Sequence, residues 1–272
     1  MEIARVAIAE AARRLEGVSD TPRLDAELLM AHAMDCTRDA LLLGRLGDAA
    51  PAGFAALVER RLGHEPIAYI TGHRAFWTIE LMVGPGVLVP RPDSETLIEA
   101  AVAHFGGRAP DRILDLGTGP GTLLLAALDQ WPHARGLGVD ASPVALDYAR
   151  RNADRLGLAA RAQFAEGDWA KGISERFDLI LANPPYIGTG EALPADVRDH
   201  EPREALFAGE AGLDAYRVLI PQIPGLLAPG GIALVEIGSA QAEPVTAIAE
   251  RAGMSARLFR DLANRPRALA LH

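Results

Sequence analysis

The amino-acid sequence predicts an α/β fold, in which a Rossmann-like, mostly parallel seven-stranded sheet follows a small helical domain. Two observations support this prediction. From about residue 112 onward, short apolar runs alternate with helical segments, which is typical of a parallel sheet covered by helices on both faces. The first ~65 residues instead have helical periodicity without a strand pattern.

Three helices are expected in this N-terminal part. The apolar face of the first is predicted to carry Ile3, Val6, Ala7 and Leu15. The second begins after Thr21, with Pro22 at its first position, and the third covers residues 51–62. The period then shifts towards two between residues 69 and 90, where Gly84-Pro85-Gly86 is expected to turn a β-hairpin. The predicted division is therefore a helical domain at 1–68, a hairpin linker at 69–90 and a second domain at 91–272.

The second domain contains the repeating strand and helix pattern. A helix is predicted to open at Pro90-Arg91-Pro92-Asp93-Ser94-Glu95 and to end near Gly106. Strands are expected at 113–116, 136–139, 162–165, 177–182 and 232–237, helices at 122–130 and 143–156, and a final antiparallel pair within 255–271. Residues 187–211 show few periodic signals and are expected to form a long loop of the kind that often serves as a lid.

Composition excludes several classes of function. The formal charge of −9 on 272 residues argues against stable nucleic-acid binding. Cys36 is the single cysteine, so neither a disulfide nor a thiolate metal cluster is expected, and no metal site is predicted. Glu2 and the absence of an apolar segment argue against a signal peptide, and prolines interrupt the uncharged run from Val218 to Val235. A cytoplasmic protein without membrane association is expected.

A glycine-rich loop follows the first predicted strand of the sheet. Its cofactor-binding candidates are Gly117, Thr118, Gly119, Pro120 and Gly121. Glycines allow a sharp turn and a close backbone approach to a ligand. Their G-x-G-x-G spacing, preceded by Asp115, differs from the dinucleotide fingerprint and indicates an adenosyl amino acid, S-adenosylmethionine, rather than a pyrophosphate.

Acidic residues stand at the ends of the next two strands. Asp140 is placed to accept both ribose hydroxyls, as an acidic residue does at this point of a nucleotide-binding sheet. Asp168 is placed to accept the adenine amino group, and Trp169 to cover the ring. A plain tight turn explains the glycine loop alone equally well, and Trp169 alone is more often a packing residue. The three features together favour an adenosyl site.

The segment Asn183-Pro184-Pro185-Tyr186 follows the fourth predicted strand directly. An amide nitrogen is a weak nucleophile, because its lone pair is delocalised into the carbonyl. The Asn183 side-chain oxygen and the Pro184 carbonyl can each accept one N–H of such a group, and Tyr186 can stack on it. Asn183, Pro184 and Tyr186 are the catalytic candidates, Asn183 to Tyr186 are the substrate-binding candidates, and Asn183 is also expected to contact the cofactor. Asparagine-proline is also a common turn dipeptide, so the motif alone does not decide.

These motifs resemble the release factor glutamine N5-methyltransferase family (PrmC/HemK). The resemblance extends over nearly the whole chain, and its segments are Pro22–Leu29, Glu65–Gly72, Leu88–Glu95, Asp115–Gly121, Asn183–Ile187 and Glu201–Leu206 with Gly209 and Gly212-Leu213. It implies that the substrate is the glutamine of a Gly-Gly-Gln motif in class I peptide chain release factors, and that S-adenosylmethionine is the methyl donor. It also implies that the helical domain helps to grip the protein substrate. Pro120 departs from the family pattern and removes one backbone N–H from the loop.

Four polar residues of these segments each allow two roles. Arg91 and Glu95 are expected to cap their helix rather than to order a loop over the cofactor, whereas for Glu201 and Arg203 a salt bridge and a substrate contact both stay open. The alternative functions are a ribosomal-protein glutamine methyltransferase, an adenine-N6 DNA methyltransferase, which the acidic charge disfavours, and a non-catalytic adenosyl-binding module. The last would have a broken Asn-Pro-Pro-Tyr motif, and here the motif is intact.

Overall fold

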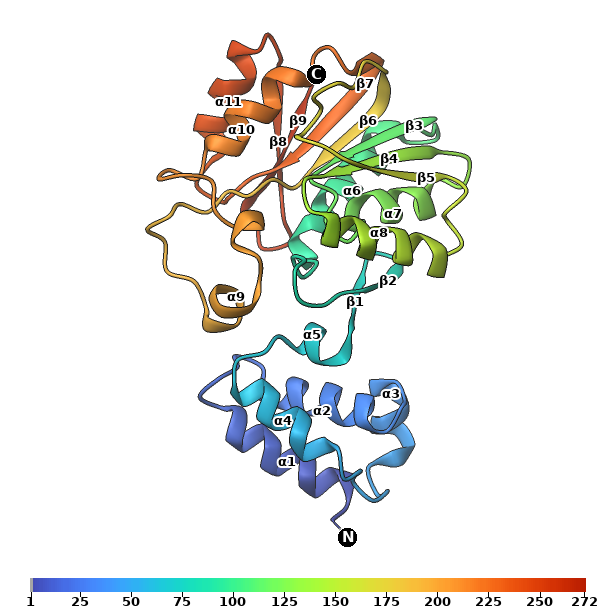
Figure 1. Cartoon of the computed structure of the whole chain (residues 1–272), viewed down its shortest axis with the longest axis vertical. Helices are drawn as coiled ribbons and strands as arrows, with labels where there is room; N and C mark the ends of the chain where they lie inside the picture. The colour runs from blue at the N-terminus through green and yellow to red at the C-terminus, as the bar shows by residue number, and fades with distance from the viewer. Residues whose placement is uncertain (1) are drawn as a thin grey trace. The chain divides into compact units, whose positions relative to one another are not determined.

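The computed structural model describes residues 2–272 and divides into two compact units (Figure 1). The helical unit runs to His73 and also includes Leu193–His200. The sheet unit consists of Arg74–Ala192 and Glu201–His272. A short segment from the second half of the sequence thus belongs to the helical unit.

The helical unit contains short helices separated by tight turns. Its elements are α1 (Ala4–Leu15), α2 (Pro22–Ala33), α3 (Arg38–Ala40), η1 (Leu41–Arg45), α4 (Phe54–Leu62), α5 (Ile67–Thr71) and α9 (Ala195–His200). Pro22 occupies the first turn of α2 as predicted, where its missing N–H has no helical partner to lose.

The predicted apolar face of α1 is wrong in two of its four residues. Ile3 and Val6 are 40% and 48% exposed, although Ala7 and Leu15 are buried. The buried face consists of Ala4, Ala7, Ile8, Ala11 and Leu15, which recur at helical spacing. Small alanines allow α2 to pack closely against α1, so the largest apolar side chains do not identify the buried face here.

Acidic residues of the Pro22–Leu29 segment lie inside the helical unit. Asp25 is 5% exposed and accepts a hydrogen bond at 2.8 Å from Nε of Arg61, which joins α2 to α4. Glu27, equally buried, is held by Arg23 at 2.6 Å and by Arg38 at 2.7 Å. These carboxylates are paired, as buried charges must be, and they stabilise the packing of the helices.

The helix α9 explains why the residues 193–200 group with the helical unit. Asp196 lies 3.6 Å from Nη1 of Arg61, and Nε2 of His200 lies 3.2 Å from the carbonyl oxygen of Gly63. The region 187–211, predicted as a long loop, therefore includes a helix with its own contacts. The two ends of the region meet within the sheet unit, where Ile187 and Phe207 form a bridge.

The sheet of the sheet unit has seven strands in the order β5-β4-β3-β6-β7-β9-β8. The strands are β3 (Arg112–Leu116), β4 (Arg135–Asp140), β5 (Ala162–Glu166), β6 (Phe177–Ala182), β7 (Leu227–Glu236), β8 (Ala256–Arg260) and β9 (Pro266–Leu271). All neighbours pair in parallel except β9, which is antiparallel to both β7 and β8. This topology confirms the predicted fold class.

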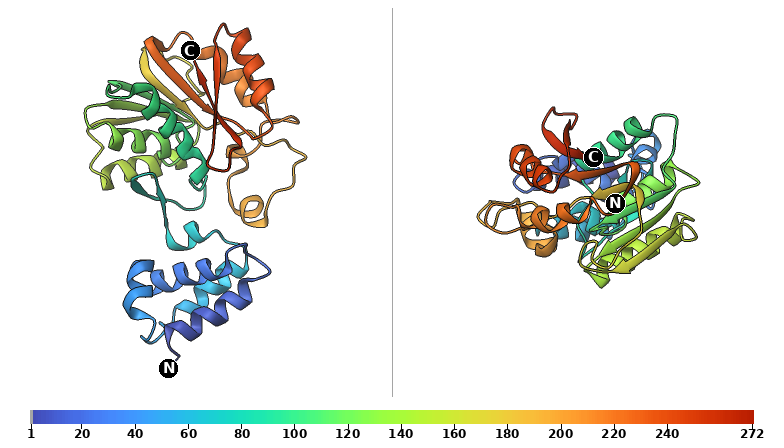
Figure 2. Two further views of the ribbon diagram at one scale, coloured as in Figure 1. Left: turned by 180° about the vertical axis from the view of Figure 1, so that it is seen from behind. Right: turned by 90° about the horizontal axis from the view of Figure 1, so that it is seen from above.

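Helices cover both faces of the sheet (Figures 1 and 2). The elements are η2 (Pro92–Ser94), α6 (Glu95–Phe105), α7 (Thr122–Gln130), α8 (Pro143–Arg155), η3 (Arg203–Ala205), α10 (Asp214–Leu219), η4 (Ile220–Gln222) and α11 (Ala242–Arg251). The helices α6, α7 and α8 lie on one face, and α10 and α11 lie on the other (Figure 1). The sheet is therefore shielded from water on both faces, which explains the continuous apolar runs in its strands.

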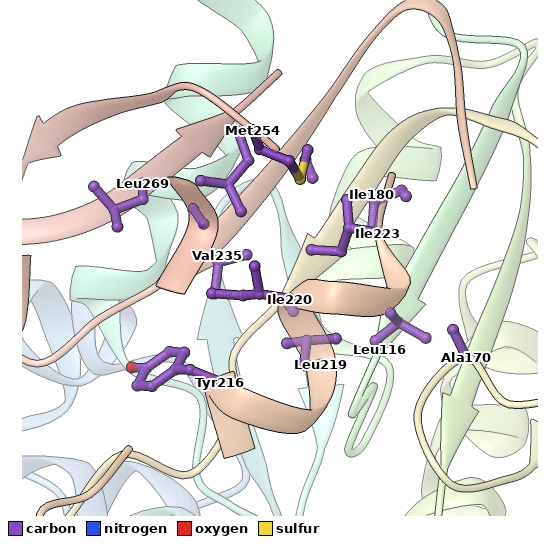
Figure 3. Close-up of a cluster of buried hydrophobic side chains, with 14 of the residues drawn as sticks. Leu116, Ala170, Ile180, Tyr216, Leu219, Ile220, Ile223, Val235, Met254 and Leu269 are labelled. Atoms are coloured by element: carbon purple, nitrogen blue, oxygen red, sulfur yellow. The ribbon is translucent and has the colours of Figure 1, made fainter. Parts of the chain in front are cut away.

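The core between the sheet and α10 illustrates this packing (Figure 3). Side chains of Leu219 and Ile220 pack against Ile180 of β6 and Val235 of β7, and all four are fully buried. Tyr216 is also fully buried, and its hydroxyl donates a hydrogen bond to the carbonyl oxygen of Glu236 at 3.0 Å. That bond satisfies the one polar group that the aromatic ring brings into the core.

The hairpin forms, but its turn lies at a different place from the one predicted. Strands β1 (His73–Phe76) and β2 (Ile79–Met82) flank Trp77-Thr78, ahead of Gly84-Pro85-Gly86. Trp77 takes a φ of 54°, and its N–H donates to Oε1 of Glu95 at 2.9 Å. A bulky residue at positive φ needs such outside support, and sequence rules do not anticipate it.

Candidate functional site

A cavity of about 430 Å³ lies at the carboxyl ends of β3, β4, β5 and β6. The strand order reverses between β3 and β6, and an open α/β sheet forms its ligand crevice at that point. Predicted site residues that line the cavity are Gly117, Thr118, Gly119, Pro120, Asp140, Asp168, Trp169, Asn183 and Pro185. The structure thus brings most of the predicted cofactor residues to a single cavity with Asn183 and Pro185, whereas Gly121, Pro184 and Tyr186 are not among the residues that line it.

The glycine loop has the backbone conformation that its composition predicts. Gly117, Gly119 and Gly121 take φ values of 75°, 56° and 87°. The N–H groups of Gly117 and Thr118 both donate to the carbonyl oxygen of Val139, at 2.8 and 3.0 Å. A Cβ on Gly117 would lie 3.4 Å from Cζ3 of Trp169, so the indole packs directly on the loop.

Asp115 lies fully buried beneath this loop. Its Oδ2 accepts hydrogen bonds from the Thr118 hydroxyl at 2.6 Å and from the Leu124 N–H at 3.2 Å. Its Oδ1 has no hydrogen-bond partner in the part of the chain that the structure describes. Burial raises the pKa of the Asp115 carboxyl to about 7. An unsatisfied acceptor thus lies beside the cavity, which Asp115 also lines.

Asp140 at the end of β4 fixes the backbone at two points of the cavity lining, Gly119 and Ser142. Its Oδ2 accepts from the Gly119 N–H and its Oδ1 from the Ser142 N–H, each at 2.8 Å. The sequence predicted the position of Asp140 but not these two bonds. Each carboxylate oxygen keeps a second lone pair, so both remain able to accept from a ligand hydroxyl.

Asp168 and Trp169 line the cavity from the end of β5. Asp168 is exposed, and Trp169 is half-buried with a φ of 52°. A positive φ is unusual for tryptophan and is kept only where neighbouring structure holds it. The indole contact with Gly117 is one such constraint.

The sequence did not predict a role for Asn152. It is fully buried on α8, and its Nδ2 donates to the carbonyl oxygen of Pro120 at 2.9 Å and to that of Met82 at 3.1 Å. Its Oδ1 accepts from the Met82 N–H at 2.7 Å. A single side chain therefore ties the glycine loop to β2, and nothing in the local sequence distinguishes it from a surface asparagine on a helix.

The Asn-Pro-Pro-Tyr segment divides between the cavity and the core. Asn183 and Pro185 line the cavity, whereas Pro184 is buried and Tyr186 packs against the core of the sheet unit. Burial raises the pKa of the Tyr186 hydroxyl to about 12. Nδ2 of Asn183 donates to the Ser94 hydroxyl at 3.2 Å, a contact that no sequence motif predicted.

The Pro-Arg-Pro-Asp-Ser-Glu segment is held in place by ion pairs. Arg91 lies 2.5 Å from Oε1 of the buried Glu201, whose Oε2 accepts from the Val89 N–H at 3.1 Å. Asp93 lies 2.8 Å from Nη2 of Arg267 on β9. These contacts join residues far apart in the sequence to one wall of the cavity.

The expectation that Arg91 and Glu95 cap their helix is wrong. Neither the η2 turn nor α6 has a side-chain cap, because Arg91 instead pairs with Glu201 and Glu95 holds the Trp77 turn. Glu201 forms its salt bridge with Arg91 and not with Arg203, and a substrate contact of either residue stays a prediction. The Arg203 guanidinium lies 4.8 Å above the Phe207 ring.

Among residues 2–272, every helix is too short or too polar to span a lipid bilayer. No cluster of three or more His, Cys, Asp or Glu side chains in this range is arranged to hold a metal ion.

Comparison with known proteins identifies the family. The PrmC N-terminal domain family matches residues 7–72, and a methyltransferase domain family matches residues 109–260. The release factor glutamine methyltransferase of Rhodospirillum rubrum is 44% identical over 256 residues, which cover 92% of this chain and 78% of that protein. The protein of the same name from Caulobacter vibrioides is 42% identical over 255 residues, which cover 91% and 88%.

A solved structure supports the fold independently. A 16S rRNA methyltransferase of T. thermophilus, in complex with AdoMet and guanosine, has a TM-score of 0.56 at 20% identity, covering 74% of this chain and 49% of that chain. The likeness at this identity concerns the fold alone. The much higher identities to the two bacterial proteins extend over nine tenths of the sequence. The chain therefore belongs to the release factor glutamine methyltransferase family.

Proposed function

We propose that this enzyme transfers a methyl group from S-adenosylmethionine to the side-chain nitrogen, N5, of the glutamine in the Gly-Gly-Gln motif of class I peptide chain release factors. The observation that carries the proposal is the single cavity lined by the glycine loop, Asp140 and Asn183. Membership of the family supplies the substrate, since its curated relatives are named for release factor glutamine.

The cavity fits an adenosyl amino acid. Its size lies within the range of small-ligand sites, and polar side chains are among the residues that line it. Asp140 offers lone pairs to ribose hydroxyls, and Asp168 beside Trp169 offers an acceptor and a ring for the adenine. The free Oδ1 of Asp115 supplies an acceptor for an ammonium group or for a donor that it orients. S-adenosylmethionine, when bound, supplies an electrophilic methyl group on a cationic sulfur.

Asn183 and Pro184 are proposed to hold the target amide. Nδ2 of Asn183 is already engaged by Ser94, so its Oδ1 is the atom left to accept an N–H from the incoming carboxamide. The Pro184 carbonyl is proposed to accept the second N–H. Two acceptors fix the nitrogen and stabilise the positive charge that develops on it as the new bond forms, after which a proton is lost to water.

Pro185 and Tyr186 are proposed to form the surface against which the planar amide rests. Pro185 lines the cavity. Tyr186 is the next residue in the sequence, and its ring is only partly buried. Proline rings have no backbone donor, so they stiffen the loop without competing for the Asn183 oxygen.

The helical unit is proposed to help grip the release factor. It belongs to the PrmC N-terminal domain family, and its buried ion pairs give it a fixed internal structure on which a protein substrate can be recognised. Its role is separate from the chemistry, because no residue of the cavity comes from it.

The test is a labelling experiment with three substrates in parallel. The purified protein is incubated with S-adenosylmethionine labelled in its methyl group and with a release factor, ribosomal proteins or duplex DNA. Label on a release-factor peptide that contains Gly-Gly-Gln is the expected result. Label on ribosomal protein alone would identify the alternative glutamine substrate, and label on DNA alone would overturn the amide chemistry. Asn183→Ala, tested in the same way, controls for methylation by a contaminating enzyme.

A further inference from the structure

The hydrogen bond from Asn183 to Ser94 joins two segments that are 89 residues apart. Asn183 follows β6, and Ser94 ends the η2 turn, where it is 2% exposed and lines the same cavity. The Asn183 carboxamide has a donor end and an acceptor end that are almost equal in shape. The partner of one end therefore determines which end faces the cavity.

The Ser94 side chain also faces the Glu236 carboxyl group at the end of β7, and it lowers the pKa of that carboxyl in the way a hydrogen-bond donor does. Glu236 is 1% exposed, and its Oε2 has no hydrogen-bond partner among residues 2–272. An ionised carboxylate can only accept hydrogen bonds, so a Ser94 O–H that turns towards Glu236 acts as the donor. The Ser94 oxygen then has only lone pairs to offer Asn183, and it selects the NH2 end of the carboxamide.

Ser94 is fixed by its surroundings rather than by its own backbone turn alone. The ion pair between Arg91 and Glu201 holds the segment before the turn, and the ion pair between Asp93 and Arg267 holds the turn itself. The position of the Ser94 hydroxyl is therefore set by β9 and by the segment around residue 201. A hydroxyl held in this way can impose an orientation on a neighbouring group.

We propose that Ser94 is a positioning residue, which with Glu236 sets the rotation of the Asn183 carboxamide so that Oδ1 faces the substrate nitrogen. The proposal rests on the proposed function. If the carboxamide rotated by half a turn, its NH2 would face the NH2 of the target glutamine. Two donors would then oppose each other, and the acceptor needed in the transition state would be absent.

The first test compares Ser94→Ala and Ser94→Thr with a matched control, Thr96→Val, which removes another buried hydroxyl in the same region. Ser94→Ala is expected to lower kcat about tenfold, the value of one orienting hydrogen bond, with KM for the release factor and Kd for S-adenosylmethionine changed less than threefold. Ser94→Thr keeps the hydroxyl and is expected to restore most of kcat. Thr96→Val is expected to leave kcat unchanged.

A double-mutant cycle tests whether Ser94 acts through Asn183. In the Asn183→Ala background, Ser94→Ala is expected to cause no further loss of kcat, because the group it orients is gone. An equal tenfold loss in both backgrounds would show that Ser94 affects the reaction by another route, and the proposal would be overturned.

A spectroscopic measurement separates this inference from the proposed function. The chain has only three asparagines, Asn152, Asn183 and Asn264, so selective 15N-asparagine labelling gives few side-chain NH2 signals, and the Asn183→Ala spectrum assigns one pair. Ser94→Ala is expected to shift that pair and to speed its hydrogen exchange, whereas Thr96→Val is not. Unchanged Asn183 signals in Ser94→Ala overturn the inference, even in an enzyme that methylates release factors. Failure of the wild-type enzyme to label a release factor overturns the proposed function, and the NMR result then still decides whether Ser94 orients Asn183.

Discussion

The loop after β3 and the loop after β6 meet at one cavity but are held in different ways. The glycine loop is fixed mainly by nearby groups, namely the buried Asp115 that precedes it and Asp140 on the adjacent strand β4. The Asn-Pro-Pro-Tyr loop is fixed through Ser94, from a segment 89 residues away. In the proposed function, the first loop offers its backbone to the cofactor, whereas the second offers the Asn183 side chain, whose orientation must be imposed.

This difference leads to different expected results of mutation. Changes near the glycine loop should affect cofactor affinity and folding. Changes around Asn183 should affect turnover, because the orientation of one carboxamide matters only while the target nitrogen reacts.

The largest effect is expected for Asn183→Ala. Loss of the acceptor Oδ1 should lower kcat by about 100-fold or more, whereas Kd for S-adenosylmethionine should change less than tenfold. Single-turnover kinetics and titration calorimetry measure the two quantities. Equal losses in S-adenosylmethionine affinity and in kcat would show that the two loops do not differ in the way described.

Replacing one or the other partner of the Arg91–Glu201 ion pair should reduce stability by different amounts. Arg91→Met takes the cation away from a carboxylate whose side chain is 1% exposed, and it should lower the free energy of unfolding by about 3 kcal/mol. Glu201→Gln leaves Arg91, which is 35% exposed and can be hydrated, and should cost about 1 kcal/mol. Urea denaturation of both variants measures the difference, and the reverse order would contradict the assignment of burial.

Two glycines of the first loop offer a matched pair. Gly119→Ala meets no atom within 4 Å and lies on the cavity, so it should weaken S-adenosylmethionine binding about tenfold, with about 1 kcal/mol of destabilisation from its positive φ. Gly121 has a φ of 87°, and a Cβ there would lie 2.7 Å from Cδ1 and 3.1 Å from Cγ of the fully buried Leu125, so Gly121→Ala should reduce stability by about 2 kcal/mol or more. Calorimetric binding and thermal unfolding, measured together, distinguish them. Equal stability losses would show that the loop is not packed as described.

The smallest effect is expected from pH. Burial raises the pKa of the Glu236 carboxyl to about 7, above its usual value of 4.5. The groups that face it are Ser94, Asp93, Arg91, Tyr186, Tyr216 and Arg267. Above pH 7 the carboxylate accepts from Ser94. Below pH 7 it is protonated and can donate, which frees the Ser94 O–H to select the wrong end of Asn183.

We therefore expect kcat to fall about three- to fivefold between pH 8 and pH 6. Glu236→Gln should remove this fall of kcat at low pH, since a glutamine does not titrate.

The free energy of unfolding should depend on pH in the opposite direction to kcat. The folded state binds the proton more tightly than the unfolded chain, so the contribution of Glu236 to stability is greatest below pH 4.5 and is lost as the pH rises through 7. If the fall of kcat at low pH persists in Glu236→Gln, the titrating group is a residue other than Glu236.

The sequence predicted what depends on local pattern. The limits of β6 and α7, the antiparallel pair at the C-terminus and the position of Asp140 all follow from apolar periodicity and turn residues, and they were confirmed. The prediction of the buried face of α1 was wrong, because alanines rather than larger side chains make the close contact. Ser94 and Asn152 were missed because their partners are defined only once distant segments pack. The cofactor and substrate roles assigned to the site residues, Asp168 and Tyr186 among them, remain predictions.

One feature of the chain path affects how the protein is made. The chain crosses from one unit to the other after His73, after Ala192 and after His200, so the helical unit contains a helix encoded between β6 and β7. Ribosomes deliver residues in order from the N-terminus, and domains usually fold as they emerge. A nascent chain that stops before residue 193 has α1 to α5 but leaves the Gly63 carbonyl without His200 and Arg61 without Asp196. Completion of the first unit therefore waits for synthesis to pass most of the second.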